Sequence, residues 1–401
     1  MEIHLLSTAR PRIILGIDAS NIRGGGGVTH LVELLRAADP AKHGFSHAIV
    51  WSSQDTLSRI EDRSWLIKSN QPWLNKNLFW RTLWQRFRLA RMARAADCDL
   101  LFIPGGSYAG DFRPIVTMSQ NLLPFVWREL RRYGLSQMTL KLMLLRWTQS
   151  STFRRADGLI FLTRYAQDAV MRVIKTNCGK TTIIPHGIDS RFACPPREQL
   201  PINQYSADRL FRILYVSIID MYKHQWHVAQ AVVQLRKIGL PVAMELVGPA
   251  YPPALNRLRQ TLDKIDPIGE VVRYSGAVPH VKLQACYAQA DLCVFASSCE
   301  TYGQILTEAM SSGLPVACSN RSAMPELLGD AGVYFDPENP NDIARTLRML
   351  IESSDLRAKL ATESFKRVQT YSWRRCADET FGFLVRVAAE NRQRVIAGKC
   401  G

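Results

Sequence analysis

Short runs of apolar residues alternate along the chain with longer segments that have the period of amphipathic helices. This alternation is typical of parallel sheets whose strands are joined by crossover helices. In the first half, the apolar runs predict buried strands at 12–20, 47–53, 99–105, 114–120, 157–163 and 181–185. In the second half, they predict strands at 211–217, 242–248, 271–276, 291–297, 315–319 and 332–335. The pattern therefore predicts an α/β fold of two doubly wound, Rossmann-like domains in tandem.

A stretch without a clear period separates the two halves. Residues 186–208 are rich in proline and polar side chains, which is typical of an interdomain linker. Beyond the last predicted strand, helical periodicity continues with no further strand to connect, over 341–353, 355–370 and 374–396. The expected divisions are a first domain over 1–190, a second over 191–370 and a C-terminal helix over 371–401 that packs back on the first domain.

The stretch ETYGQILTEAMSSGLPV, residues 300–316, places two carboxylates eight positions apart just after a predicted strand. Open α/β sheets bind their ligands at this edge. A helix is expected to start beside Gly303, so that its free amides and positive dipole end suit a phosphate. Glu300 and Glu308 could accept paired hydrogen bonds from sugar hydroxyls. The local pattern alone equally fits an ordinary helix start with one solvated glutamate.

The segment SSCETYGQILTEAMSSGLPV resembles the Glu-x7-Glu signature of the retaining family-4 glycosyltransferases of GT-B fold. The blocks SGAVPHVKLQACYAQAD, PELLGDAG and IIPHGIDSRF are similar to further family segments and occur in the same order. The resemblance covers roughly residues 180–340 well and the first half weakly. The signature positions that match are both glutamates, Tyr302, Gly303, Ala309, Met310, Gly313 and Pro315.

This resemblance implies a GT-B enzyme whose two domains face each other across a cleft, with the acceptor on the first domain and the nucleotide sugar on the second. It implies transfer of a sugar with retention at the anomeric carbon, with no metal and no cofactor, because the nucleotide sugar is a substrate. Glu300 would face the donor hexose as the catalytic residue, and Glu308 would hold the ribose hydroxyls. The donor-binding residues that it implies are Lys223, Val278, Thr301, Tyr302, Gly303, Gln304, Ile305, Glu308, Gly26 and Gly27.

Two positions depart from the family pattern. LYVSIIDMYKHQ, residues 214–225, is similar to the family's phosphate-binding segment through Lys223, but Ile218 stands where an arginine is expected. The diphosphate clamp is therefore weaker or completed elsewhere, unless Lys223 is an ordinary lysine at a helix start. Gln120 and Asn121 stand where many relatives carry His-Asp; either could contact a sugar hydroxyl, but neither can act as a base. This favours a front-face mechanism in which the departing phosphate oxygen takes the acceptor's proton.

Positive charge is concentrated in the first half. The formal net charge is +16, and residues 1–200 hold 28 Lys and Arg against 15 Asp and Glu. Eight basic and six aromatic residues lie between Asp62 and Asp97, with no acidic residue among them. NLFWRTLWQRFRLARMARAA predicts a helix with Phe79 and Phe87 on one apolar face. That face either lies on anionic lipid, with RELRRYG adding charge, or packs on the sheet.

Two further motifs have weaker meanings. NIRGGGGVTHLVELL places four glycines between a predicted strand and helix but does not fit G-x-G-x-x-G. It predicts either a flexible turn or, on the resemblance, a loop that reaches the donor phosphate or the acceptor. The sequence from Asp97 to Asp99 spells the Asp-x-Asp of metal-dependent transferases, but it precedes a strand and is expected to be a plain helix end.

Together these features predict a hexosyltransferase acting on a lipid-linked or polysaccharide acceptor. YKHQ and QNLLPF are similar to bacterial mannosyltransferases of O-antigen assembly, so mannose is the preferred sugar. Nine scattered cysteines without Cys-x-x-Cys, and an N-terminus unlike a secretory signal, predict a cytoplasmic protein peripheral to the inner face of the membrane. The alternatives are another GT-B enzyme such as an epimerase, or a basic nucleic-acid-binding protein, for which no recognised module is visible.

Overall fold

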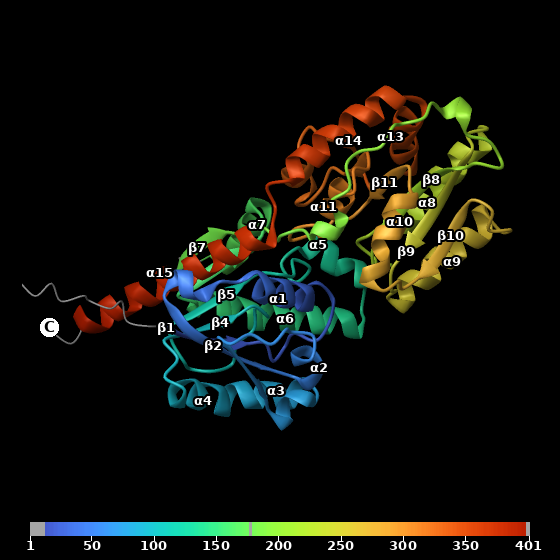
Figure 1. The fold of residues 1–401 in the computed structure, drawn as a ribbon. Helices are drawn as coiled ribbons and strands as arrows, with labels where there is room; N and C mark the ends of the chain where they lie inside the picture. The colour runs from blue at the N-terminus through green and yellow to red at the C-terminus, as the bar shows by residue number, and fades with distance from the viewer. Residues whose placement is uncertain (1–12, 176–178, 398–401) are drawn as a thin grey trace, which may run out of the picture.

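The computed structural model describes residues 13–175 and 179–397. It contains two parallel sheets, one from each half of the chain, which confirms the predicted α/β class (Figure 1). The first sheet has the order β3-β2-β1-β4-β5-β6-β7 and the second the order β10-β9-β8-β11-β12-β13. The strands of the first sheet are β1 (Ile13–Asp18), β2 (Phe45–Ser52), β3 (Leu66–Asn70), β4 (Leu100–Ile103), β5 (Ile115–Met118), β6 (Gly158–Phe161) and β7 (Lys180–Ile183). Those of the second are β8 (Phe211–Val216), β9 (Val242–Val247), β10 (Val272–Gly276), β11 (Leu292–Phe295), β12 (Val316–Ser319) and β13 (Val333–Phe335).

Both sheets are wound in the same way. Leu15 of β1 pairs with Ala48 of β2 and with Leu100 of β4, so β1 has crossovers leaving in both directions. In the second sheet, β8 occupies the equivalent position between β9 and β11. Ligands of open α/β sheets bind where the strand order reverses, just beyond the carboxyl ends of the strands. The loops after β1, β4, β8 and β11 are therefore the ones that can form a site.

Strand β3 is not among the predicted strands. Its sequence is LIKSN, and only Leu66 is buried while Ile67 is half exposed. As the edge strand of the first sheet, β3 pairs with β2 and with no other strand of the described residues. One face and one edge of β3 meet water, so this strand needs no continuous run of apolar residues. The other strands were predicted from such runs.

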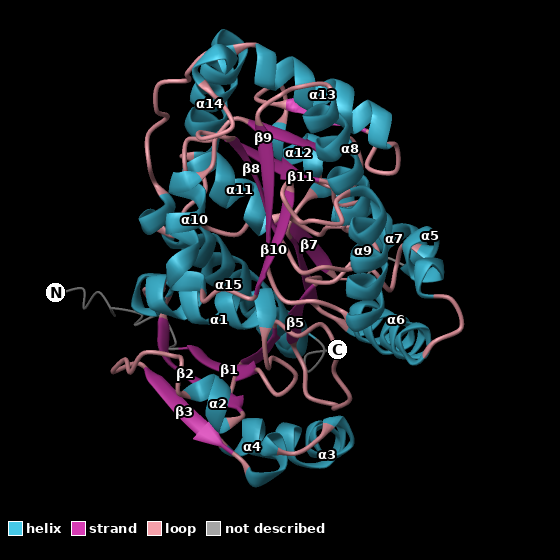
Figure 2. Ribbon diagram, turned by 90° about the vertical axis from the view of Figure 1, so that its right-hand side faces the viewer, coloured by secondary structure: helices cyan, strands magenta, loops and turns pink. Residues whose placement is uncertain are grey.

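Helices cover both faces of each sheet (Figure 2). Among the helices of the described residues, none combines the length and apolar character needed to cross a bilayer. The first-domain helices are α1 (Gly25–Ala37), α2 (Gln54–Leu57), α3 (Leu78–Trp84), α4 (Ala90–Ala95), α5 (Trp127–Leu130), α6 (Gln137–Arg155) and α7 (Arg164–Ile174). Those that follow are α8 (Gln225–Lys237), α9 (Pro252–Ile265), α10 (Leu283–Gln289), α11 (Gln304–Ser311), α12 (Met324–Leu328), α13 (Pro340–Glu352), α14 (Ser354–Val368) and α15 (Trp373–Ala397).

The last helix, α15, packs on the first domain although it follows the second domain in the sequence (Figure 1). A Cβ at Gly158 of β6 would lie 2.9 Å from the Phe383 ring and 3.0 Å from Val387, so β6 and α15 meet closely. The Asp378 carboxylate contacts the His43 ring at 2.8 Å. The chain therefore crosses between the domains twice, once through the linker and once before α15.

Candidate active site

Lys223 and Glu300 form an ion pair where β8 and β11 end side by side. Their side chains are 7% and 17% exposed, so water screens the pair poorly. The Lys223 ammonium also lies 4.9 Å from the ring centres of Tyr222 and Phe295. Lys223 precedes α8 by two residues, yet it is buried against these rings rather than solvated. The structure thus brings together the predicted catalytic carboxylate and the predicted phosphate-binding cation.

Ser322, on the loop after β12, fixes the main chain of Glu300. The Glu300 N–H donates to the Ser322 hydroxyl at 2.7 Å, and that hydroxyl lies 3.0 Å from the Glu300 carbonyl. Ser322 has a φ of +62°, a left-handed conformation that a serine adopts only at an energetic cost. Sequence reasoning missed Ser322, because no local pattern links it to a residue on another loop.

Helix α11 begins with a free amino-terminal turn. Gly303 caps it with a φ of +112°, and a Cβ there would lie 2.8 Å from the Met324 methyl group. No side chain caps the helix, and no acidic residue lies in its first turn. The first amides of α11 are therefore available to an anion, with the positive end of the helix dipole behind them.

Two of the predicted donor-binding side chains are used within the protein. The Tyr302 hydroxyl donates to the carbonyl of His186 at 3.2 Å, and the Gln304 amide donates to the carbonyl of Gly187 at 3.1 Å. Ile305 packs its half-buried side chain against the core. The backbone of these positions can therefore bind a ligand, whereas the side chains of Tyr302 and Gln304 attach the start of α11 to the linker.

Glu308 is almost fully buried, with 2% of its side chain exposed. One carboxylate oxygen lies 3.2 Å from His280 Nε2, and the other accepts from the Tyr287 hydroxyl at 3.3 Å. The Arg191 guanidinium contacts the other nitrogen of the same histidine. Val278 lies half-buried on the loop that leads to His280. Each oxygen has one protein donor and keeps capacity for a second, as hydroxyl binding requires.

Gln120 joins the two domains at the predicted site. Its carbonyl accepts from the Thr301 hydroxyl at 3.3 Å, and its side-chain amide donates to the Pro104 carbonyl at 3.1 Å. A Cβ at Gly27 would lie 3.7 Å from the Gln120 side-chain oxygen. Asn121 instead accepts a backbone N–H two residues further on. The structure therefore groups Gly27, Gln120 and Thr301, and leaves Asn121 in a local turn.

The glycine run is not the loop that was expected, because helix α1 already starts at Gly25. Only Gly24 precedes it, in an extended conformation. Gly25 has a φ of +61°, which glycine adopts without strain. A Cβ at Gly26 would meet no atom within 4 Å, so this turn is open. Like α11, helix α1 lacks a capping side chain and an acidic residue in its first turn.

Two stacked histidines hold the linker against the first domain. The His30 ring of α1 and the His186 ring of the linker have centres 4.7 Å apart, and Trp373 of α15 lies 5.6 Å from His186. Burial lowers the pKa of His186 to about 4 and holds that of His30 well below its usual range. Both rings are therefore neutral near pH 7. Sequence reasoning missed His30, which looks like any polar residue on an amphipathic helix.

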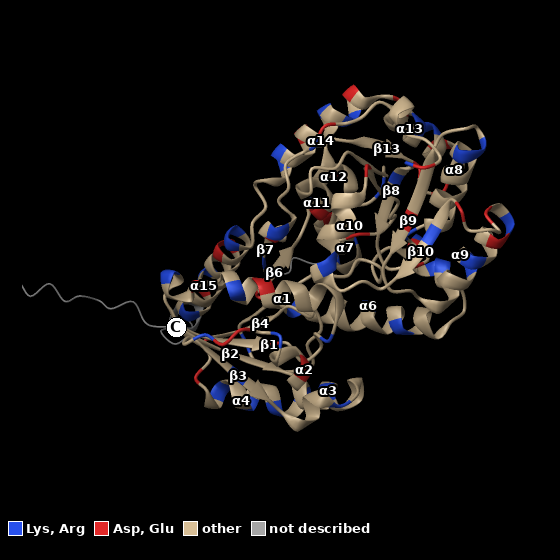
Figure 3. Cartoon of the chain, turned by 45° about the vertical axis from the view of Figure 1, so that its right-hand side comes forward, with Lys and Arg blue, Asp and Glu red and all other residues tan. Residues whose placement is uncertain are grey.

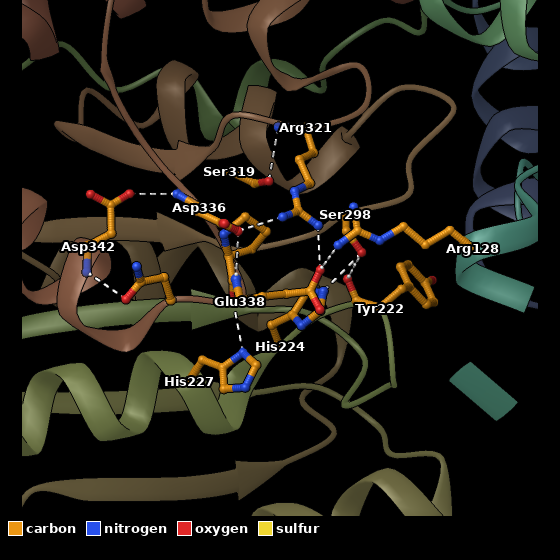
Figure 4. A network of polar contacts seen from close by, with 12 residues as sticks. Arg128, Tyr222, His224, His227, Ser298, Ser319, Arg321, Asp336, Glu338 and Asp342 are labelled. Carbon is orange, nitrogen blue, oxygen red and sulfur yellow. Dashed lines mark hydrogen bonds and ion pairs between the residues drawn. The ribbon is translucent and has the colours of Figure 1, made fainter. Parts of the chain in front are cut away.

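A polar cluster around Glu338 also joins the two domains (Figure 4). The Glu338 carboxylate accepts from Arg128 at 2.6 Å, from Arg132 at 2.7 Å and from Arg321. Hydrogen bonding with Arg132 is the main cause that lowers the pKa of Glu338 to about 2. Arg128 and Arg132 belong to the predicted lipid-facing segment RELRRYG, and the structure shows both bound to the second domain.

The same interface contains two further contacts between the domains. Glu129 pairs with Arg132 and accepts from the Ser298 hydroxyl at 2.7 Å. Tyr133 donates to the buried carboxylate of Asp220 at 2.8 Å. Ser298 lies two residues before Glu300, so α5 and the turn after it support the loop of Glu300 from the first domain.

The predicted basic helix is continuous over residues 78–95, with a π-helical turn, η3 (Gln85–Leu89), between α3 and α4. The side that faces the sheet contains Trp84 and Leu89, whereas Phe79 and Phe87 are 63% and 61% exposed. Packing on the sheet therefore does not explain these two rings. Figure 3 shows basic residues along α3, α4 and α6. Helix α6 and the turn before it expose further large apolar side chains, namely Leu135, Leu140, Met143, Leu144 and Trp147.

The Asp-x-Asp sequence has a structural explanation. Asp97 ends the helix with a φ of +50°. Asp99 accepts the Ile14 N–H at 2.8 Å and pairs with Arg392 of α15 at 2.6 Å. Its carboxylate thus links β1 to the last helix.

Two family models match this chain and together span most of it. The glycosyl transferases group 1 model matches residues 197–367, and the Glycosyltransferase Family 4 model matches residues 24–192. The chain is 34% identical to the Escherichia coli O-antigen chain mannosyltransferase B over 109 residues, which are 27% of this chain and 29% of the relative. It is 28% identical over 257 residues to a D-inositol 3-phosphate glycosyltransferase of Nocardioides sp., covering 60% of this chain and 56% of the relative. The matches thus span about half or less of these relatives.

Solved structures show the same fold. Sucrose-phosphate synthase from Thermosynechococcus elongatus superposes with a TM-score of 0.71 at 18% identity, covering 96% of this chain and 100% of that one. Anabaena Alr3699/HepE, crystallised with UDP and glucose, gives a TM-score of 0.66 at 18% identity, covering 93% and 99%. The predicted GT-B architecture is confirmed by these similarities.

Proposed function

From the premise that this chain belongs to the family-4, or group 1, glycosyltransferases, we propose that it transfers a hexose, preferably mannose, from a nucleotide sugar to a lipid-linked or polysaccharide acceptor with retention. Mannose is preferred because two relatives are described as mannosyltransferases, one of them of an O-antigen chain. Retention is part of the proposal and follows from the Glu-x7-Glu resemblance.

One observation carries the proposal: Glu300 and Glu308 lie on either side of a free helix start, with Lys223 against Glu300. In a nucleotide sugar, hexose hydroxyls lie on one side of the diphosphate and ribose hydroxyls on the other. We infer that the diphosphate lies on the first amides of α11 and near Lys223. The hexose then lies at Glu300, and the ribose hydroxyls at Glu308.

The reaction needs no protein base in this arrangement. The bond from the anomeric carbon to the donor phosphate breaks, and the acceptor oxygen forms its new bond on the same face. The departing phosphate oxygen takes the acceptor's proton, while Lys223 and the helix dipole stabilise its charge. Gln120 is close enough to Thr301 and Gly27 to orient a hydroxyl but cannot accept a proton for catalysis.

We propose further that the first domain touches an anionic membrane. Ten of its large apolar side chains between residues 78 and 147 are strongly exposed, and they lie among arginines. Exposed apolar groups interspersed with cations are typical of surfaces that lie on anionic lipid.

The test is a panel of nucleotide sugars added to the purified protein. One donor should raise the melting temperature, and NMR of the product should show the donor's anomeric configuration preserved. Glu308→Ala should abolish the shift, whereas Glu270→Ala, at an exposed position before β10, should keep it. A shift unchanged in Glu308→Ala would reject the site, and an inverted product would reject the mechanism.

A further inference from the structure

Arg23 and Arg81 place two positive charges next to each other at the carboxyl edge of the first sheet. Arg23 follows β1 and directly precedes the glycine run, and Arg81 lies in α3. The Arg23 guanidinium donates to the carbonyl of Leu74 at 2.6 Å, and that of Arg81 donates to the carbonyl of Ser20 at 3.1 Å. Burial, and then the charge of Arg23, lower the pKa of Arg81.

Neither charge is neutralised by a described residue of the protein. Within residues 13–175 and 179–397, no carboxylate lies at ion-pair distance from Arg23 or Arg81, and Arg81 Nε has no hydrogen-bond partner. Asp18, near in sequence, is 1% exposed and is held at 2.5 Å by the buried amide of Gln85. Two like charges fixed next to each other by neutral carbonyls repel, and a bound anion would offset this repulsion. Each guanidinium keeps donors in the fork geometry that fits a phosphate.

Exposed apolar side chains precede Arg81 in helix α3. Leu78, Phe79 and Trp80 form the first turn of the same helix as Arg81 and are 50%, 63% and 37% exposed. Lys76 lies over the Trp80 ring at 4.8 Å and adds a further positive charge. A soluble phosphate would leave these side chains in water, whereas a ligand with a phosphate and an apolar chain would cover both parts.

We propose that Arg23 and Arg81 bind the phosphate of a phosphate-bearing lipid whose apolar chain lies against Leu78, Phe79 and Trp80. This inference rests on the proposed function, in which the acceptor is lipid-linked. It assigns the head of that acceptor to the first domain, opposite the donor residues of the second. It also gives the π-helical turn a role, because Gln85 in that turn holds Ser20 and Asp18 beneath Arg81.

The experiment compares vesicles of neutral phospholipid that contain either polyprenyl phosphate or the uncharged polyprenol. The wild-type protein should bind the first at least about tenfold more tightly, because charge-assisted hydrogen bonds to phosphate are lost with the alcohol. Arg23→Gln and Arg81→Gln should each remove most of this preference. Arg88→Gln, exposed on the same helical segment, is the matched control and should keep it. Arg23 is also exposed, so its variant reports on the site even if Arg81→Gln folds poorly.

Several outcomes would overturn the assignment. Equal binding of the two vesicles by the wild-type protein would exclude a phosphate site. If Arg88→Gln loses the preference as much as Arg23→Gln and Arg81→Gln do, the preference comes from general surface charge. If inorganic phosphate stabilises the wild-type protein but not Arg81→Gln, and the vesicles show no preference, the ligand is a soluble phosphate. The donor-induced melting shift is measured in parallel: its absence would reject the proposed function, while the vesicle preference would still decide this site.

Discussion

The two domains share one strand order, but the domain junction and the basic stretch of the first domain differ in how far their charges are paired. In the second domain, the cations at the domain junction have acidic partners, as Lys223 has in Glu300 and Arg321 has in Glu338. In the first domain, eight basic residues lie between positions 63 and 96, and only Arg63, Lys68 and Arg94 have an ion pair within the described residues. The same stretch exposes Phe79 and Phe87.

This difference indicates two kinds of partner. Charges that are already paired and partly buried hold their geometry before a ligand arrives, as recognition and catalysis of a small polar molecule require. Unpaired charges beside exposed apolar groups gain stability only from an external anionic and apolar surface. Variants of Glu300 and Glu308 in the second domain should therefore change donor chemistry, and variants of the exposed side chains on the first-domain helices should change membrane binding, each without the other.

The largest effect is expected for Glu300→Gln, which should lower kcat by about a thousandfold in a transfer assay, because the carboxylate facing the hexose supplies negative charge that stabilises the transition state. It also leaves the Lys223 charge buried without its partner, which should destabilise the protein by about 3 kcal/mol. Vesicle binding should be unchanged, because that property belongs to the first domain. The double variant Lys223→Met/Glu300→Gln should recover stability in thermal unfolding but not activity. Recovery of both would show that Glu300 is only a structural partner of Lys223.

The second effect concerns donor affinity. Glu308→Gln keeps the size of the side chain but removes the charge that accepts sugar hydroxyls, so the donor Kd should rise about ten- to a hundredfold. Titration calorimetry with the donor measures this, with Glu270→Gln as the exposed control in the same domain. An equal donor Kd in wild type and Glu308→Gln would show that the ribose does not bind at Glu308.

The local pattern of apolar residues predicted the strands that are buried on both faces. A strand buried on both faces, such as β11, is a continuous apolar run, and the bounds expected for it agree within one or two residues. The edge strand β3 has one wet face and escaped detection. Glu300, Glu308 and Gly303 were found because they lie on one loop and one helix.

Residues that act across distant loops could not be found in this way. Ser322 fixes Glu300 from another strand end, and Glu338 collects arginines from both domains. Their sequence neighbourhoods have no distinguishing period or spacing. The glycine run shows the converse, because its composition is typical of a loop but Gly25 starts a helix, whose buried face contains Val28, His30, Leu31, Leu34 and Leu35.

A smaller effect, on vesicle binding, is expected for the exposed aromatic side chains of the first domain. Replacing Phe79 and Trp147 by serine removes two of the most exposed rings, 63% and 70% exposed, and should weaken binding to phosphatidylglycerol vesicles about tenfold. Donor affinity should stay at the wild-type value. Ile268→Ser, 80% exposed in the second domain, is the matched control. If Ile268→Ser weakens vesicle binding as much, the membrane face is not confined to the first domain.

The smallest effect lies where the two domains meet. Glu338→Gln removes a carboxylate shared by Arg128, Arg132 and Arg321, and should lower the melting temperature at pH 7 by about 2 to 4 °C. The folded pKa of Glu338, about 2, lies below its usual 4.5, so its contribution is complete above pH 4.5 and is lost as the pH falls through about 2. The difference between wild type and variant in unfolding scans should therefore shrink over that interval and vanish below it. Glu352→Gln, in an exposed pair with Arg348, should show no such difference. A gap that persists below pH 2 would mean that the variant acts through packing at the domain junction rather than through this charge.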